Sequence, residues 1–135
     1  MKNNKIIIAS GPVIVEDGKV LLNQHGDTEF WKFCGGKVED YATDLIENAR
    51  REAKEEMGIE LEILDENPFV LYTMKITEDN EKIDVILVHF LAKRIGKIKP
   101  GKDIRKWKWI PVEELYKENI APNIIPTLDY FGFVK

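Results

Sequence analysis

The stretch that decides the fold runs over residues 51–59 and reads Arg51-Glu52-Ala53-Lys54-Glu55-Glu56-Met57-Gly58-Ile59. It closes a longer segment in which apolar residues recur at helical spacing: Ile46, Ala49, Ala53 and Met57. This period places them along one side of an α-helix. Asp44 is positioned to cap the helix with Glu47 as its capping-box partner, and Gly58 is positioned to end it. The sequence therefore predicts a helix from Asp44 to Met57.

Three carboxylates lie on the polar side of this helix. Glu52 and Glu56 stand one turn apart with Glu55 beside them, so their charges repel unless a cation intervenes. Carboxylate oxygens of this kind suit Mg²⁺ or Mn²⁺. Acidic residues opposite an apolar stripe are more often a hydrated surface, which Arg51 and Lys54 would neutralise. Helix geometry alone favours that simpler interpretation.

The complete motif favours the metal-binding interpretation instead. With the glycine pair Gly35-Gly36 upstream, the segment resembles the signature of the Nudix hydrolases, G-x5-E-x7-R-E-U-x-E-E-x-G-U, where U is aliphatic. Every fixed position from Arg51 to Ile59 is filled, with Ala53 as a small residue at the aliphatic position. The resemblance covers most of the chain. It implies an α/β/α sandwich, an α/β (α+β) fold with a mixed sheet between helices.

The same resemblance implies Mg²⁺-dependent hydrolysis of a nucleoside diphosphate linked to another group. Nucleoside triphosphates, ADP-ribose-like compounds and related nucleotides all remain open as substrates. Glu52, Glu55 and Glu56 match the family's metal-binding and base-forming glutamates. Arg51 matches the arginine that orients Glu52 through an ion pair. Gly35 matches the glycine whose carbonyl reaches the metal.

The spacing departs from the signature at one place. Gly36 lies one residue too far from Arg51, so the extra residue is expected in the loop 39–43, and the signature's first glutamate has no counterpart. The general base also stays open. Some relatives use an acidic loop residue before the last strand, where this chain has Asp103; a hydrated loop residue is an equal alternative. A non-catalytic nucleotide-binding or regulatory Nudix-like module is the competing function.

Asn123 is the candidate for recognition of the base. It resembles the asparagine near the C-terminal helix with which some nucleotide-sanitising relatives read a purine edge. A helix cap is the alternative, slightly favoured because asparagine is common before a helix. His89, on an apolar strand, is expected to be an interior histidine, His25 a loop-surface residue, and Cys34 a small buried residue.

The remaining elements follow from hydrophobic patterning. Strands are expected at 6–9, 13–15 and 20–22, separated by Gly11-Pro12 and by a turn at Asp17-Gly18, and later at 69–76, 83–92 and 107–110. The run 83–92 is apolar on both faces and is expected at the centre of the sheet. Pro111 should open a helical segment through residue 116, and residues 124–131 a closing helix.

Composition sets the outer limits. The 135 residues are one domain's worth of chain, so a single domain over residues 1–135 is expected. A net charge of −4 argues against polymeric nucleic acid or a membrane as partner, and the partner that the resemblance implies is a small nucleotide. The single cysteine excludes an intrachain disulfide. The run Ile6–Ala9 is too short for a signal peptide, which indicates a cytoplasmic protein; monomer and homodimer both stay open.

Overall fold

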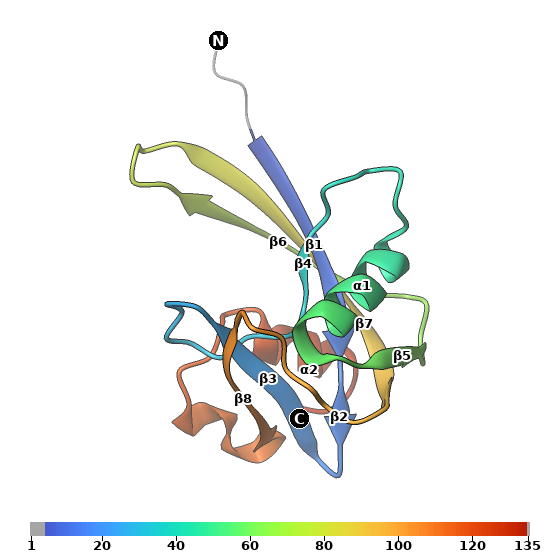
Figure 1. The fold of residues 1–135 in the computed structure, drawn as a ribbon. Coiled ribbons are helices and arrows are strands. Elements are labelled where there is room, and N and C mark those ends of the chain that lie inside the picture. Colours follow the sequence, from blue (N-terminus) through green and yellow to red (C-terminus); the bar gives the residue numbers. More distant parts are fainter. Residues whose placement is uncertain (1–4, 135) are drawn as a thin grey trace.

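Strand β7 (Lys82–Ile95) organises the larger sheet of the computed structural model, which describes residues 5–134. It pairs in parallel with β1 (Lys5–Val13) and antiparallel with β5 (Glu60–Ile63) and β6 (Phe69–Ile76). The short strand β4 (Gly36–Lys37) pairs antiparallel with the other side of β1. The sheet is therefore mixed and five-stranded, and the central position predicted for the run within β7 is confirmed (Figure 1).

A second sheet of three strands lies beside the first. Its order is β2 (Val15–Glu16), β3 (Lys19–His25) and β8 (Ile104–Pro111), with the predicted tight turn at residues 17–18 joining β2 to β3. The chain then forms the 3-10 helix η1 (Val112–Lys117) and the helix α2 (Ile124–Tyr130). Both C-terminal elements begin where the sequence predicted them.

Helix α1 (Leu45–Met57) carries the acidic motif, and its ends are set by local sequence. The side chain of Asp44 accepts a hydrogen bond of 2.7 Å from the backbone N–H of Ile46, which satisfies one free donor of the first turn. Gly58 ends the helix at a φ of 68°, a conformation that favours glycine. Both predicted caps are confirmed. The capping-box role expected of Glu47 is wrong, because its carboxylate instead lies 3.3 Å from Arg50 Nε.

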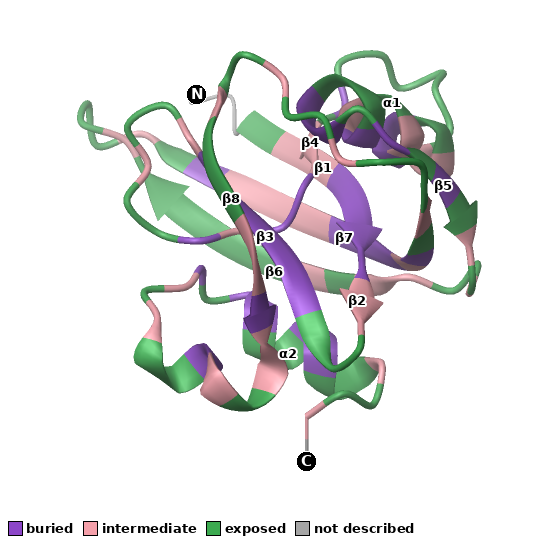
Figure 2. Ribbon diagram, turned by 60° about the horizontal axis from the view of Figure 1, so that its bottom comes forward, coloured by how far each residue is buried: buried purple, intermediate pink, exposed green. Residues whose placement is uncertain are grey.

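The helices cover opposite faces of the sheets, as alternating residues of single strands show. In β3, Leu21 belongs to the core cluster with Ala53 and Met57 of α1, whereas Leu22 belongs to the cluster with Leu128 of α2. Successive strand residues point to opposite faces, so each strand contributes to both clusters. In Figure 2 most of β3 is coloured as buried. The predicted α/β/α arrangement with a mixed sheet is confirmed.

Some sequence predictions were wrong. The dipeptide Gly11-Pro12 does not separate two strands: β1 continues through it, paired with His89 and Phe90 of β7. Proline is tolerated there because β4 pairs only with Ala9 and Ser10, so this part of β1 is paired on one side. The second residue of the glycine pair, Gly36, opens β4.

The loop between β4 and α1 lies at the surface. The loop 39–43 is exposed and closed by Asp40, whose carboxylate accepts a hydrogen bond of 2.9 Å from the N–H of Ala42. The residue extra to the Nudix spacing therefore lies in a surface loop, as expected.

Within residues 5–134, no helix has the length and apolar character needed to cross a bilayer.

Candidate active site

Arg51 links the carboxylates of α1. Its guanidinium lies 3.1 Å from Glu52 Oε1 through Nη2 and 3.2 Å from Glu55 Oε2 through Nη1. The ion pair predicted between Arg51 and Glu52 is therefore present. Glu55 extends to the outer side of Arg51, and its side chain is 58% exposed, whereas that of Glu52 is 12% exposed. The three predicted carboxylates thus occupy different environments on one helix.

Glu52 and Glu56 share a site that disfavours two negative charges. Burial and a hydrogen bond with Glu56 raise the pKa of Glu52 from its ordinary value of 4.5 to about 7. Burial alone would also raise the pKa of Glu56, but contact with His25 outweighs it and the pKa lies below the ordinary value. Glu56 is therefore the carboxylate of the pair that ionises first.

His25 was placed wrongly by the sequence, which predicted a loop-surface residue. It ends β3, and its Nε2 is buried and lies 3.2 Å from Glu56 Oε2, without the alignment of a hydrogen bond. The register of β3 against β8 shifts between Gln24 and His25, which accompanies this placement. Only the pairing of distant strands brings this histidine to α1, and the local sequence carries no sign of it.

The carboxylates open onto one cavity of about 370 Å³, here called the acidic cavity. Its lining residues come from β3, α1 and the loop before β8: His25, Glu52, Glu55, Glu56, Gly101, Lys102, Asp103 and Ile104. The loop is tied to the end of α1, because the N–H of Gly101 donates to the carbonyl of Glu56 at 2.8 Å. The structure therefore brings Asp103 to the same cavity as the three predicted glutamates.

The donors of the acidic cavity suit a divalent cation. Carboxylate oxygens are hard ligands, and a cation would favour the ionised form of Glu52, which burial and the contact with Glu56 disfavour by raising its pKa. Among residues 5–134, no group of three or more His, Cys, Asp or Glu side chains is already arranged as a metal cluster. Glu55 lines the cavity while its carboxylate is paired with Arg51, so a cation would compete with the arginine for this carboxylate.

The glycine pair forms the wall beside these carboxylates. The N–H of Gly35 donates to Glu56 Oε1 at 3.3 Å. A Cβ atom on Gly36 would come within 2.4 Å of the Glu52 carboxyl carbon, so only glycine leaves room for Glu52 in this position. Gly35 thus lies at the site as predicted, and the contact that it makes there is through its N–H.

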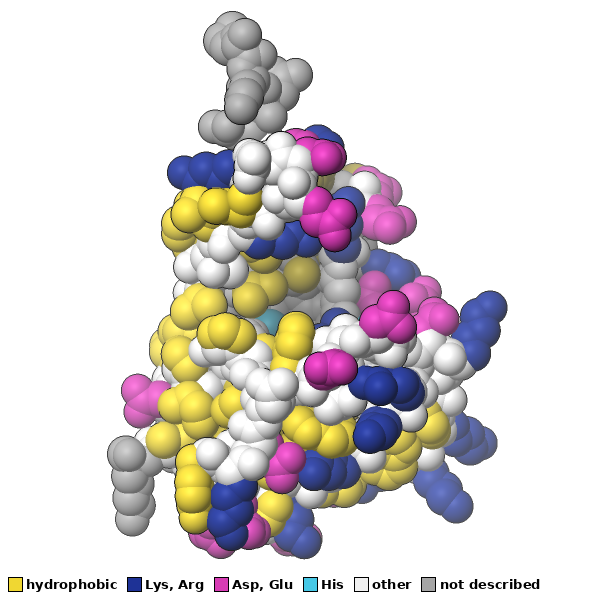
Figure 3. Space-filling model, turned by 90° about the vertical axis from the view of Figure 1, so that its left-hand side faces the viewer, with side chains coloured by type: hydrophobic (Ala, Val, Ile, Leu, Met, Phe, Trp, Pro, Cys, Tyr) yellow, Lys and Arg dark blue, Asp and Glu magenta, His cyan; other side chains and the backbone are white. Residues whose placement is uncertain are grey.

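A second cavity, of about 470 Å³, lies on the other side of the glycine pair. We call it the lysine-rimmed cavity. Three lysines and no acidic residue are among its lining residues: Ile7, Ala9, Ser10, Phe30, Lys32, Phe33, Gly35, Gly36, Lys37, Lys75, Leu87, His89, Ala121, Pro122 and Asn123. Figure 3 shows the hollow on this face, with hydrophobic and basic side chains at its border and acidic ones beside them. Its lining therefore suits an anionic ligand with an apolar part.

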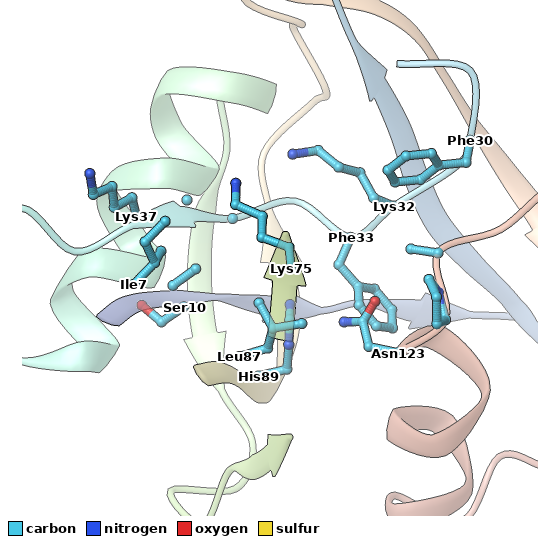
Figure 4. A pocket seen from close by; sticks show the side chains of 15 residues that line it. Ile7, Ser10, Phe30, Lys32, Phe33, Lys37, Lys75, Leu87, His89 and Asn123 are labelled. Atoms are coloured by element: carbon cyan, nitrogen blue, oxygen red, sulfur yellow. The ribbon is translucent and has the colours of Figure 1, made fainter. Parts of the chain in front are cut away.

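Asn123 lies in this cavity together with Phe33 and His89 (Figure 4). It precedes α2, but its side chain makes no capping hydrogen bond. The backbone of Asn123 is already helical, with φ −82° and ψ −8°, whereas a capping residue is extended, so its side chain is not placed to accept from the free N–H groups of the first turn. The cap that the sequence slightly favoured is therefore absent, and the amide of Asn123 is left to the cavity.

His89 and Cys34 are both buried, as expected. Burial lowers the pKa of His89 to about 4, so its ring is neutral at the pH of the cell. It also contributes to the wall of the lysine-rimmed cavity, which the sequence did not indicate. Burial and the nearby Glu56 raise the pKa of the Cys34 thiol well above its ordinary value, which makes it a poor nucleophile.

Comparison with known proteins identifies the arrangement. The family model of the NUDIX domain matches residues 6–131. A search of curated proteins found no match. Among solved structures, the E. coli ORF135 protein is 27% identical, with a TM-score of 0.70 over 95% of this chain and 89% of that one.

Two further structures share the fold at lower identity. An Ap4A hydrolase from C. elegans is 23% identical, with a TM-score of 0.70 over 93% of this chain and 94% of that one. An ADP-ribose pyrophosphatase from Streptococcus suis is 19% identical, with a TM-score of 0.65 over 91% of this chain and 87% of that one. These two likenesses concern the fold alone.

Proposed function

The chain belongs to the Nudix hydrolase family, and from this premise we propose that it is a Mg²⁺- or Mn²⁺-dependent pyrophosphohydrolase that cleaves the diphosphate linkage of a nucleoside diphosphate derivative. Membership makes it a hydrolase acting on pyrophosphate bonds, in a family that generally uses divalent cations. The observation that carries the proposal is the acidic cavity, where Glu52, Glu56 and Asp103 meet beside the glycine pair.

In this proposal Glu52, Glu55 and Glu56 hold the cation together with the carbonyl of Gly35. When bound, the cation neutralises charge on the phosphate oxygens and lowers the pKa of the attacking water. Arg51 keeps Glu52 oriented and favours its ionised form, because its guanidinium lies 3.1 Å from Glu52 Oε1.

The general base removes a proton from the attacking water, so it must be an ionised carboxylate within reach. Glu52 and Asp103 both line the acidic cavity and are the two candidates. Glu52 is oriented by Arg51, whereas Asp103 lies on a loop whose neighbour Gly101 is anchored to α1. Removal of each carboxylate in turn, with activity followed against pH, separates the two.

We place the nucleoside in the lysine-rimmed cavity, with its phosphates at the glycine pair. Figure 4 shows Lys32, Lys37 and Lys75 extending on one side of this cavity, with His89 and Asn123 lying deeper. Ammonium groups attract phosphate oxygens, and an amide can hydrogen-bond to the edge of a base. Phe30, 41% exposed at the rim, offers a surface on which a base can stack.

The partner in this proposal is a small nucleotide rather than polymeric nucleic acid or a membrane, because a net charge of −4 gives no broad basic surface. Because an Ap4A hydrolase and an ADP-ribose pyrophosphatase share the fold, dinucleoside polyphosphates and ADP-ribose are among the nucleotides to test. We further propose a cytoplasmic enzyme with one domain.

The proposal is tested with purified protein and a panel of nucleoside triphosphates, ADP-ribose, nucleotide sugars and dinucleoside polyphosphates. Each compound is incubated with Mg²⁺, with Mn²⁺ or with EDTA, and the products are separated by ion-exchange chromatography. We expect at least one compound to be cleaved at a phosphoanhydride bond with either metal. No compound should be cleaved in EDTA. A nucleotide that binds but is never cleaved would instead identify a non-catalytic binding module.

A further inference from the structure

We propose that Asn48 is a positioning residue that fixes the guanidinium of Arg51 against Glu52. Asn48 lies on α1, one turn before the acidic motif, and is 1% exposed. The inference rests on the proposed function, because its consequence for turnover requires that Glu52 take part in hydrolysis. The family signature leaves this position unspecified, so the argument depends on the contacts in this chain.

The amide of Asn48 is hydrogen-bonded on both sides. Its Nδ2 donates to Ser10 Oγ at 2.9 Å and to the carbonyl of Gly36 at 3.1 Å. Ser10 Oγ in turn donates to the carbonyl of Leu45 at 2.9 Å, in the first turn of α1. These bonds fix which way the amide faces, because its nitrogen must point to the two acceptors. Its oxygen therefore points to Arg51.

Arg51 Nη2 donates to Asn48 Oδ1 at 2.7 Å, and the same nitrogen lies 3.1 Å from Glu52 Oε1. The other contact, with Glu55, joins side chains that are 44% and 58% exposed. Exposed ion pairs of this kind contribute little, since water competes and two long side chains lose freedom. The buried amide of Asn48 is therefore the firm anchor of the guanidinium.

Asn48 also binds the glycine against which Glu52 packs. The carbonyl that it binds belongs to Gly36, whose Cα lies against the Glu52 carboxyl group. One amide thus connects two neighbours of Glu52, the guanidinium of Arg51 and the backbone of Gly36. Replacement of Asn48 by alanine would release both, without removing any group that touches the substrate in the proposed site.

The first test does not depend on activity. In ¹⁵N relaxation measurements, the Arg51 Nε–H of the wild type should be ordered, and in Asn48→Ala its order parameter should fall below about 0.6, the range of flexible groups. Leu115→Val, in the core cluster around α2, serves as a control for lost packing and should leave Arg51 ordered. An equally ordered Arg51 in Asn48→Ala would overturn the proposal.

The second test is a double-mutant cycle with Arg51→Ala. We expect Asn48→Ala to lower kcat about tenfold with KM changed less than about twofold, as for loss of one hydrogen bond to a charged group. In the Arg51→Ala background, Asn48→Ala should lower kcat by a smaller factor than in the wild type, because only its bond to the Gly36 carbonyl is left to lose. Equal losses in both backgrounds would overturn the proposal. If the wild type cleaves no compound of the panel, the proposed function is wrong. The relaxation measurement still tests the role of Asn48 independently of activity.

Discussion

The carboxyl group of Glu52 packs against the Cα of Gly36, where an added Cβ would come within 2.4 Å of Glu52 Cδ. The contact joins Gly36, the first residue of β4, to the acidic motif on α1. Because the opposing atoms are the end of a flexible side chain, a larger residue at position 36 would push Glu52 aside more readily than it would disrupt the fold.

Gly36→Ala should therefore reduce activity more than stability. We expect kcat to fall by about tenfold or more, with a change in free energy of unfolding below about 1 kcal/mol. Gly96→Ala is the matched control, because Gly96 has a φ of 98° with open space around it. That change should lower the melting temperature through backbone strain and leave kcat unaltered. An unchanged kcat in Gly36→Ala would contradict the close packing of Glu52 against Gly36.

Arg51→Ala tests the orientation of Glu52. The arginine lies 3.1 Å from Glu52 and lines neither cavity, so its loss should act on turnover rather than on nucleotide binding. We expect kcat to fall about tenfold or more with KM within about threefold of the wild type. Steady-state kinetics and a thermal melt on the same variant decide the matter. A large loss of stability with unaltered kcat would show a purely structural arginine.

The helix α1 could be predicted because its information is local. Asp44, the apolar stripe and Gly58 lie within fifteen consecutive positions, so the helix and both of its ends follow from local sequence. Its metal chemistry followed from the family resemblance, because helix geometry alone favours a hydrated surface. The position of Asp103 at the acidic cavity followed only from family resemblance. His25 could not be placed at all, since its contact with Glu56 depends on the register of β3 against β8.

Long-range pairing explains the other failures. β1 runs through Gly11-Pro12 because β7 holds it along that length, and a local reading of the dipeptide predicts a break. The side chain of Asn123 was expected to cap α2, but its backbone is already helical, with φ −82° and ψ −8°, instead of extended as in a capping residue. In both cases the local preference is ordinary, and a partner distant in sequence or the backbone conformation decides the outcome.

Asn123→Ala examines recognition of the base. With no capping bond to lose, the variant should keep most of its stability, while the ratio of kcat/KM for purine over pyrimidine triphosphates moves several-fold toward unity. The measurement is a pair of kinetic assays on each protein. An unchanged ratio with a stability loss of about 1 kcal/mol would return Asn123 to a helix-capping role.

Stability against pH tests the environment of Glu52. Its pKa rises from 4.5 to about 7 on folding, so the folded chain holds this proton more tightly, and the stabilisation present below 4.5 is lost as pH rises through 7. His89 has the opposite sign: with a pKa lowered from 6.5 to about 4, its contribution is present above 6.5 and lost as pH falls toward 4. The pH ranges of these two opposing changes in stability overlap, so variants are needed to separate them.

Glu52→Gln isolates the first contribution. In EDTA, the variant should gain stability relative to the wild type between about pH 5 and pH 8, by an amount on the order of 1–3 kcal/mol. Urea unfolding at several pH values measures the difference, with His89→Gln as the variant in which the opposing slope is removed. Parallel curves for wild type and Glu52→Gln would show that Glu52 titrates normally in the folded protein.

The most direct test of the central claim is kcat for Glu56→Gln on the best substrate of the panel, in saturating Mg²⁺. Glu56 is 7% exposed, hydrogen-bonded to Gly35 and lines the acidic cavity, so loss of its charge should lower kcat about a hundredfold or more. Glu66→Gln, an exposed glutamate outside the cavity, should match the wild type. A folded Glu56→Gln protein with wild-type kcat would contradict the account.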